Sequence, residues 1–131
     1  MSLLPGRPPN ALVFDLVGGE AFFVSLVDRF YEGVEQDPLL RPMYPEDLGE
    51  SKAHLAGFLA QYWGGGEQYY SAARGHPRLR MRHVPFTIGE AERDAWLTHM
   101  TAAVCSAGLE ADLVSRFLEY FAMAAQHLVN A

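Results

Sequence analysis

Cysteine is almost absent from this sequence, with Cys105 alone among 131 residues. One thiol cannot build an internal disulfide framework or a thiolate-rich zinc or iron–sulfur site. A chain without disulfides suits a reducing compartment, so we expect a cytoplasmic protein.

Long apolar runs are also missing. No segment approaches the ~20 apolar residues of a membrane-spanning helix, and residues 1–10 contain three prolines but no signal-peptide core. We therefore expect no membrane span, a flexible tail over residues 1–10 and one folded domain over residues 11–131.

Positive charge is scarce, since 10 Lys and Arg face 16 Asp and Glu and leave a net charge of −6. Binding to nucleic-acid phosphates needs a basic face, so a nucleic-acid partner is not expected. The exception is local, because Arg74, Arg78, Arg80 and Arg82 gather near His76 and His83. Small anionic groups could dock there.

Several catalytic signatures are missing as well. The sequence has no G-x-S-x-G elbow and no phosphate-binding loop, and Cys105 has no adjacent base. Its five histidines do not form the H-E-x-x-H pattern of a zinc hydrolase helix. Nucleophilic catalysis and metalloprotease chemistry are therefore disfavoured.

What the sequence does contain is helical periodicity. Half of its residues are apolar and a fifth are charged, as in ordinary globular proteins. Apolar residues recur every three or four positions in several segments, and no convincing alternating strand occurs. We predict an all-α domain with helices or turns over 11–17, 22–34, 38–43, 55–63, 77–83, 89–104 and 109–128.

His83 is the candidate metal ligand. It ends the arginine-rich stretch and is followed by Val84, Pro85 and Phe86, which would place an apolar wall beside its ring. An imidazole in that position could ligate a metal from one side. The alternative is that His83 only bonds a carbonyl in its loop.

Three polar aromatic residues form a second candidate group. Tyr31 lies on the apolar side of its predicted helix, Tyr44 follows Met43, and Trp96 lies in a later helical stripe. Buried hydroxyl groups need partners, and an indole N–H can only donate. These side chains either donate hydrogen bonds into a ligand pocket or serve as ordinary core residues.

Five blocks of sequence together resemble the group II (O-type) truncated haemoglobins. The similarity runs from about Phe14 to Asn130. It is carried by F-Y-E from Phe30, M-Y-P-E-D from Met43, F-L-A-Q-Y-W-G-G from Phe58, R-G-H-P-R-L-R-M-R-H from Arg74 and E-R-D-A-W-L from Glu92.

This resemblance implies a two-over-two helical sandwich around haem b. His83 matches the proximal iron ligand. On the opposite face Tyr31, Tyr44 and Trp96 match the polar residues that donate hydrogen bonds toward the gas ligand. Ser51 and Leu55 match ligand-facing positions of the preceding helix, with Ser51 as a small residue that leaves an access path.

The resemblance also implies haem contacts beyond the iron ligand. Arg82, His54 and Tyr70 fall where propionate partners are expected. Apolar contacts are expected from Phe58, Leu59, Phe86, Ile88 and Met100, although several of these residues would also serve as plain core.

The implied function is binding of dioxygen, with nitric oxide and carbon monoxide as further ligands. We expect a binding protein rather than an enzyme. The alternative is a haem peroxidase or nitric oxide dioxygenase that works with a reductase. A haem-free helical interaction domain is a third class, and homo-oligomers are compatible with all three.

Overall fold

The computed structural model describes residues 11–70 and 88–129, except for the side chains of residues 11 and 12. These residues form helices, turns and connecting loops, and no strand occurs within the described ranges. The elements are α1 (Ala11–Val17), α2 (Glu20–Glu35), η1 (Arg41–Met43), α3 (Gly49–Ala60), η2 (Gln61–Gly65), η3 (Glu67–Tyr69), α6 (Glu90–Cys105) and α7 (Ala111–Leu128).

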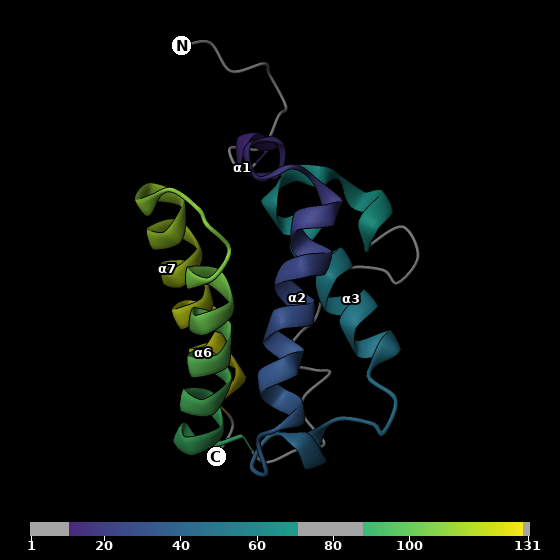
Figure 1. Cartoon of the computed structure of the whole chain (residues 1–131), viewed down its shortest axis with the longest axis vertical. Helices are drawn as coiled ribbons and strands as arrows, with labels where there is room; N and C mark the ends of the chain where they lie inside the picture. The colour runs from purple at the N-terminus through teal and green to yellow at the C-terminus, as the bar shows by residue number, and fades with distance from the viewer. Residues whose placement is uncertain (1–10, 71–87, 130–131) are drawn as a thin grey trace.

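Two pairs of helices face each other (Figure 1). Helix α2 packs against α3, α6 packs against α7, and α2 also contacts α6 across the space between the pairs. The short helix α1 lies at one end, against η2. The prediction of an all-α, two-over-two arrangement is confirmed.

The apolar stripes explain why the long helices pack in this way. In α2 the buried side chains recur at helical spacing: Phe23, Leu26, Val27, Phe30, Tyr31 and Val34. In α7 they are Phe117, Tyr120, Phe121, Ala125 and Leu128. The rings of Phe23 and Phe117 meet at 6.3 Å, an edge-on aromatic contact within the core.

Helix α3 ends differently from the prediction. Apolar spacing predicted a helix through residue 63, but α3 ends at Ala60 and widens into the π-helical turn η2. Gly64 has a φ of 111° there, which glycine adopts at little steric cost. The last helix also begins at Ala111, two residues later than Leu109. The predicted helix over 77–83 lies outside the described residues.

Gly57 allows η3 to pack closely on α3. A Cβ atom added at Gly57 would overlap the backbone carbonyl oxygen of Tyr69, which follows η2 in the chain. Backbone atoms cannot swing away as a flexible side chain does, so the missing side chain is a packing requirement.

We expect Gly57→Ala to lower the melting temperature. Alanine in place of glycine normally stabilises a helix interior by roughly 0.5–1 kcal/mol. Overpacking against the Tyr69 carbonyl should outweigh that gain and give a net loss of about 1–3 kcal/mol. Thermal unfolding followed by circular dichroism measures the change. A variant at least as stable as the parent would show that the Tyr69 backbone moves to make room for the added methyl group.

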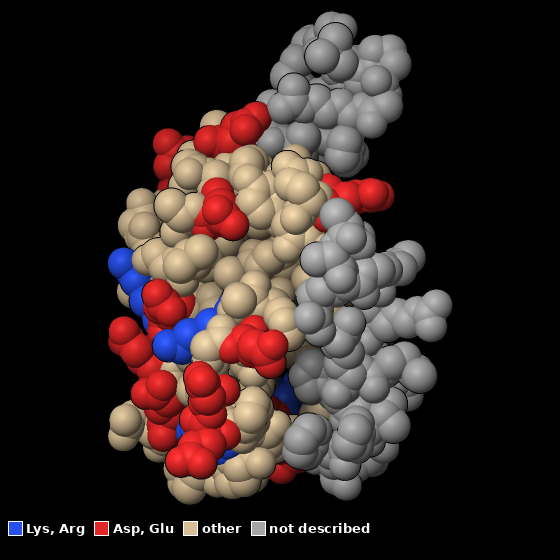
Figure 2. Space-filling model, turned by 90° about the vertical axis from the view of Figure 1, so that its right-hand side faces the viewer, with Lys and Arg blue, Asp and Glu red and all other residues tan. Residues whose placement is uncertain are grey.

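Acidic side chains are spread over the face shown in Figure 2, and basic ones occur in only a few places among its described residues. This part of the surface does not offer the continuous basic patch that nucleic-acid phosphates require. Within residues 11–70 and 88–129, no helix is long and apolar enough to cross a lipid bilayer.

Candidate functional site

Three polar aromatic residues from three separate elements meet in the structure. Tyr31 lies on α2, Tyr44 directly follows η1, and Trp96 lies on α6. The rings of Tyr31 and Tyr44 are 5.4 Å apart and nearly perpendicular. Trp96 packs edge-on against Phe30, the neighbour of Tyr31, at 5.2 Å. The three residues singled out by the sequence are therefore neighbours.

The backbone around Tyr44 is held by Arg41. The guanidinium of Arg41 donates to the carbonyl oxygens of Tyr44 at 3.3 Å, Pro45 at 2.9 Å and Glu46 at 2.8 Å. The amide of Tyr44 donates back to the carbonyl of Arg41 at 3.2 Å. These bonds hold the irregular segment after η1 in place, and with it the backbone position from which the Tyr44 side chain extends.

Trp96 and Tyr31 both act on the Tyr44 phenol as hydrogen-bonding partners, and each lowers its pKa, as donors to the phenol oxygen do. The indole N–H of Trp96 can act only as a donor. Burial raises the pKa of Tyr31, and its interaction with Tyr44 raises that pKa further, as expected for a hydroxyl that donates its proton. Tyr44 consequently keeps its own proton for a third partner.

Both phenols remain protonated at neutral pH. Burial raises the pKa of Tyr44 to about 12, despite the opposing effect of the hydrogen bonds from Trp96 and Tyr31. Burial likewise moves the pKa of Tyr31 far above its usual value. The group is therefore a set of neutral donors, with the hydroxyl of Tyr44 at its centre.

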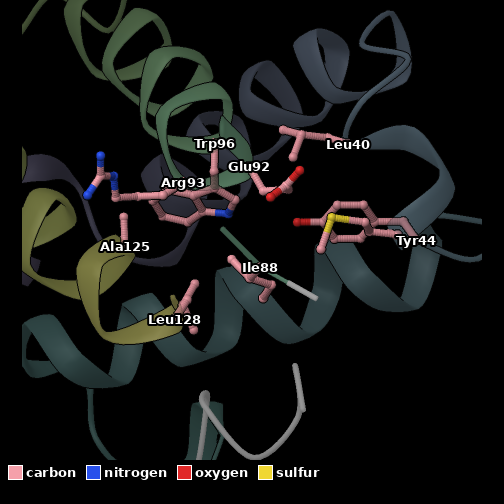
Figure 3. Close-up of a pocket in the computed structure, with 9 residues that line it drawn as sticks. Leu40, Tyr44, Ile88, Glu92, Arg93, Trp96, Ala125 and Leu128 are labelled. Atoms are coloured by element: carbon pink, nitrogen blue, oxygen red, sulfur yellow. The ribbon is translucent and has the colours of Figure 1, made fainter. Parts of the chain in front are cut away.

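A small hollow of about 20 Å³ adjoins this group, which is room for roughly one water-sized molecule. In Figure 3 the indole nitrogen of Trp96 and the phenol oxygen of Tyr44, two residues of its lining, point toward each other. The lining is mainly apolar: Leu40, Met43, Tyr44, Ile88, Glu92, Arg93, Trp96, Ala125 and Leu128.

Two charged residues on this wall were missed by the sequence analysis. One carboxylate oxygen of Glu92 accepts the backbone N–H of Gly89 at 2.7 Å, which caps the start of α6. Arg93 donates to Gln126 at 2.6 Å and pairs with Asp94 at 2.9 Å. A helix over residues 89–104 was predicted, but no sequence pattern indicates that Glu92 also lines a pocket.

The remaining predicted residues fall into three groups. On α3, Ser51, His54 and Leu55 are half-buried, and Phe58 and Leu59 are buried in the core. Tyr70 and Met100 are also buried, with the Tyr70 ring 5.6 Å from that of Phe58. His83, Arg82 and Phe86 lie outside the described residues, as does the rest of the predicted proximal segment.

Comparison with known proteins identifies the family of this chain. The pattern of the bacterial-like globins matches residues 12–130. This chain belongs to the bacterial-like globin family. It is 42% identical over 112 residues to the group 2 truncated hemoglobin YjbI of Bacillus subtilis, covering 86% of this chain and 84% of that protein. The resemblance to group II is thus confirmed.

Solved structures of haemoglobins share the fold of this globin. A thermostable hemoglobin from Thermobifida fusca is 55% identical, with a TM-score of 0.86 over 90% of this chain and 96% of the other. A truncated oxygen-avid haemoglobin from Bacillus subtilis is 40% identical, with a TM-score of 0.82 over 89% and 98% of the two chains. The truncated-globin fold is therefore established.

Membership of this family implies a haem cofactor and binding of small ligands at it. The described wall fits that group, because it combines apolar side chains such as Ile88 and Leu128 with one donor hydroxyl, that of Tyr44, which Trp96 orients. Among the described residues no three His, Cys, Asp or Glu side chains could hold a bare metal ion. Haem iron needs only one protein ligand on its proximal side.

Proposed function

We propose that this globin binds haem b through His83 and holds dioxygen beneath Tyr31, Tyr44 and Trp96, with nitric oxide and carbon monoxide as further ligands. Haem supplies the iron to which such a ligand binds and the electron density that polarises it. The protein residues supply orientation, donors and a dry surrounding.

The observation that carries the proposal is that Tyr31 and Trp96 converge on the Tyr44 phenol as its hydrogen-bonding partners. A hydroxyl that already accepts two bonds is a stronger donor, since hydrogen bonds in a chain polarise one another. The proton of Tyr44 is the one left over, and a polarised diatomic ligand is an acceptor of the right chemistry. Tyr31 and Trp96 thereby act on the ligand through Tyr44.

The other predicted residues complete the proposed site. Arg82, His54 and Tyr70 would pair with the haem propionates. Phe58, Leu59, Phe86, Ile88 and Met100 would cover the apolar macrocycle. Ser51 and Leu55 would face the ligand from α3, with the short side chain of Ser51 leaving an access path. The imidazole of His83 would bind iron in its neutral form.

Strong hydrogen-bond donors favour slow release of bound dioxygen over its rapid delivery. A hydrogen bond to a charged or strongly polarised acceptor is worth ~1.5–3 kcal/mol, which slows ligand release. The haemoglobin from B. subtilis is oxygen-avid, which agrees with this physical argument. We therefore propose storage, sensing or chemistry in the cytoplasm rather than bulk oxygen transport.

Absorption spectra of the ferric, ferrous and oxygenated protein test the proposal. We expect a Soret band in all three states and a stable oxygenated spectrum after the reduced protein is exposed to air. A purified protein that takes up no haem when haem is supplied would contradict the cofactor assignment. A ferrous protein that oxidises at once without an oxygenated spectrum would contradict stable oxygen binding.

Glu92 favours one second candidate function. Its carboxylate lines the pocket beside the Tyr44 and Trp96 donors, and a carboxylate near a reacting oxygen can move a proton. This suits a peroxidase, or a dioxygenase that converts nitric oxide and dioxygen to nitrate with one electron per cycle from a reductase. Sustained nitric oxide consumption with a reductase present would separate this activity from simple binding.

A further inference from the structure

His99 and Asp37 form a second link between the two segments that carry Trp96 and Tyr44. The ring Nε2 of His99 lies 2.7 Å from Oδ2 of Asp37. The side chains are 24% and 17% exposed, so this pair is largely shielded from water. His99 lies on α6, three residues after Trp96, and Asp37 lies just beyond the end of α2.

Asp37 organises the turn that leads to Tyr44. Its Oδ1 accepts the backbone N–H groups of Leu39 at 2.8 Å and Leu40 at 3.4 Å. Its own carbonyl accepts the amide of Arg41 at 2.8 Å, and Arg41 in turn holds the Tyr44 backbone. One carboxylate is therefore connected by hydrogen bonds to the whole segment from residue 37 to Tyr44.

His99 is held equally firmly on the other side. Its ring packs directly on the backbone of α2 at Gly33, where an added Cβ atom would overlap Nδ1 of the imidazole. The ring thus has little freedom to turn away from Asp37. The hydrogen bond from His99 contributes most to lowering the pKa of the Asp37 carboxyl, which agrees with a formed pair rather than a chance approach.

We propose that His99 and Asp37 are positioning residues that set the Tyr44–Trp96 hydrogen bond and thereby the strength of the donor offered to the ligand. Two connections join the same two segments, one through His99 and Asp37 and one through Trp96 and Tyr44. Loss of the His99–Asp37 connection lets α6 and the 37–44 segment shift, which lengthens the Trp96–Tyr44 hydrogen bond. This inference rests on the proposed function for its kinetic consequence, but not for its structural one.

The test uses His99→Leu, which keeps side-chain bulk and removes the bond to Asp37. We expect dioxygen to dissociate from the ferrous protein about three- to thirtyfold faster, the usual range for coupling through a packed network. His99→Gln keeps a side-chain N–H that reaches toward Asp37 and should restore most of the parent rate. Arg29→Met is the matched control, because Arg29 links α2 to Ser106 at the far end of α6.

A spectroscopic readout separates positioning from general loosening. The chain has two tryptophans, and the Nε1 of Trp63 is buried without a hydrogen-bond partner in the described structure. In the carbon monoxide-bound protein, we expect His99→Leu to move the indole N–H resonance of Trp96 toward that of an unbonded indole. The Trp63 resonance should stay in place, and Arg29→Met should move neither.

A double variant completes the test. If His99 acts through Tyr44, then His99→Leu should not accelerate dioxygen release further in a Tyr44→Phe protein, because coupled residues are not additive. Additive rate effects would overturn the proposal, as would an unchanged Trp96 resonance in His99→Leu. If Tyr44→Phe does not affect release but the Trp96 resonance still moves in His99→Leu, the proposed function fails and the positioning role stands.

Discussion

His83→Gly is expected to abolish the iron-ligated haem spectrum of this globin. In the proposed site His83 is the proximal ligand, and without its imidazole the iron has no protein ligand on that side. The ferrous and oxygenated spectra should then be lost, and haem should be retained weakly or not at all. Free imidazole should diffuse into the space left by the side chain and restore the Soret band. Titration of the apoprotein with haem, followed by absorption, measures both effects.

The other histidines provide the controls for this experiment. His127 lies exposed in the last turn of α7, and His127→Ala should leave the haem spectrum unchanged. His54 is half-buried on α3, where the proposal gives it a propionate rather than iron. A normal spectrum in His83→Gly combined with a lost spectrum in His54→Ala would mean that His54 on α3 binds the iron, and it would refute the assignment of His83.

The long helices were predictable because each buries a single stripe. In α2, Phe23, Val27 and Tyr31 lie four residues apart and all are buried, so periodicity alone locates the helix. The π-helical turn after α3 was not predictable from spacing. It depends on a contact distant in sequence, because a Cβ atom at Gly65 would overlap the ring of Phe14.

The candidate site was predictable only in part. Tyr31, Tyr44 and Trp96 are far apart in the sequence, and spacing alone left them as possible core residues. The surrounding sequence blocks, through their likeness to group II truncated haemoglobins, put the three together. Which of them donates to which could not be predicted, because that depends on side-chain directions at the junction of three elements.

The pair of His99 and Asp37 was missed for a related reason. Asp37 before Pro38 indicates a turn, and the structure confirms that its carboxylate caps that turn. No local pattern indicates that the second carboxylate oxygen reaches a residue 62 positions later. A lone histidine on a helix gave no signal either, since its partner is brought near only by the packing of α6 on α2.

Tyr44→Phe is expected to cause the largest change in ligand release among the variants that keep the haem. The substitution keeps the ring and removes the one hydroxyl whose proton is left for the ligand. Loss of a hydrogen bond worth ~1.5–3 kcal/mol should accelerate dioxygen dissociation about ten- to a hundredfold. Stopped-flow displacement of dioxygen by carbon monoxide measures the rate. Tyr120→Phe is the matched control, because Tyr120 is buried against Tyr62 and Trp63 instead.

The two residues that donate to Tyr44 should give smaller, dependent effects. Tyr31→Phe removes one of the two bonds at the Tyr44 oxygen and leaves the one from Trp96, so release should accelerate less than in Tyr44→Phe. Trp96→Leu removes the other bond and should also speed release. In a Tyr44→Phe background, Tyr31→Phe should add little, because its acceptor is already gone. Unchanged dissociation in both Tyr44→Phe and Trp96→Leu would refute the donor cage, whereas full additivity of Tyr31 and Tyr44 would mean that each donates to the ligand independently.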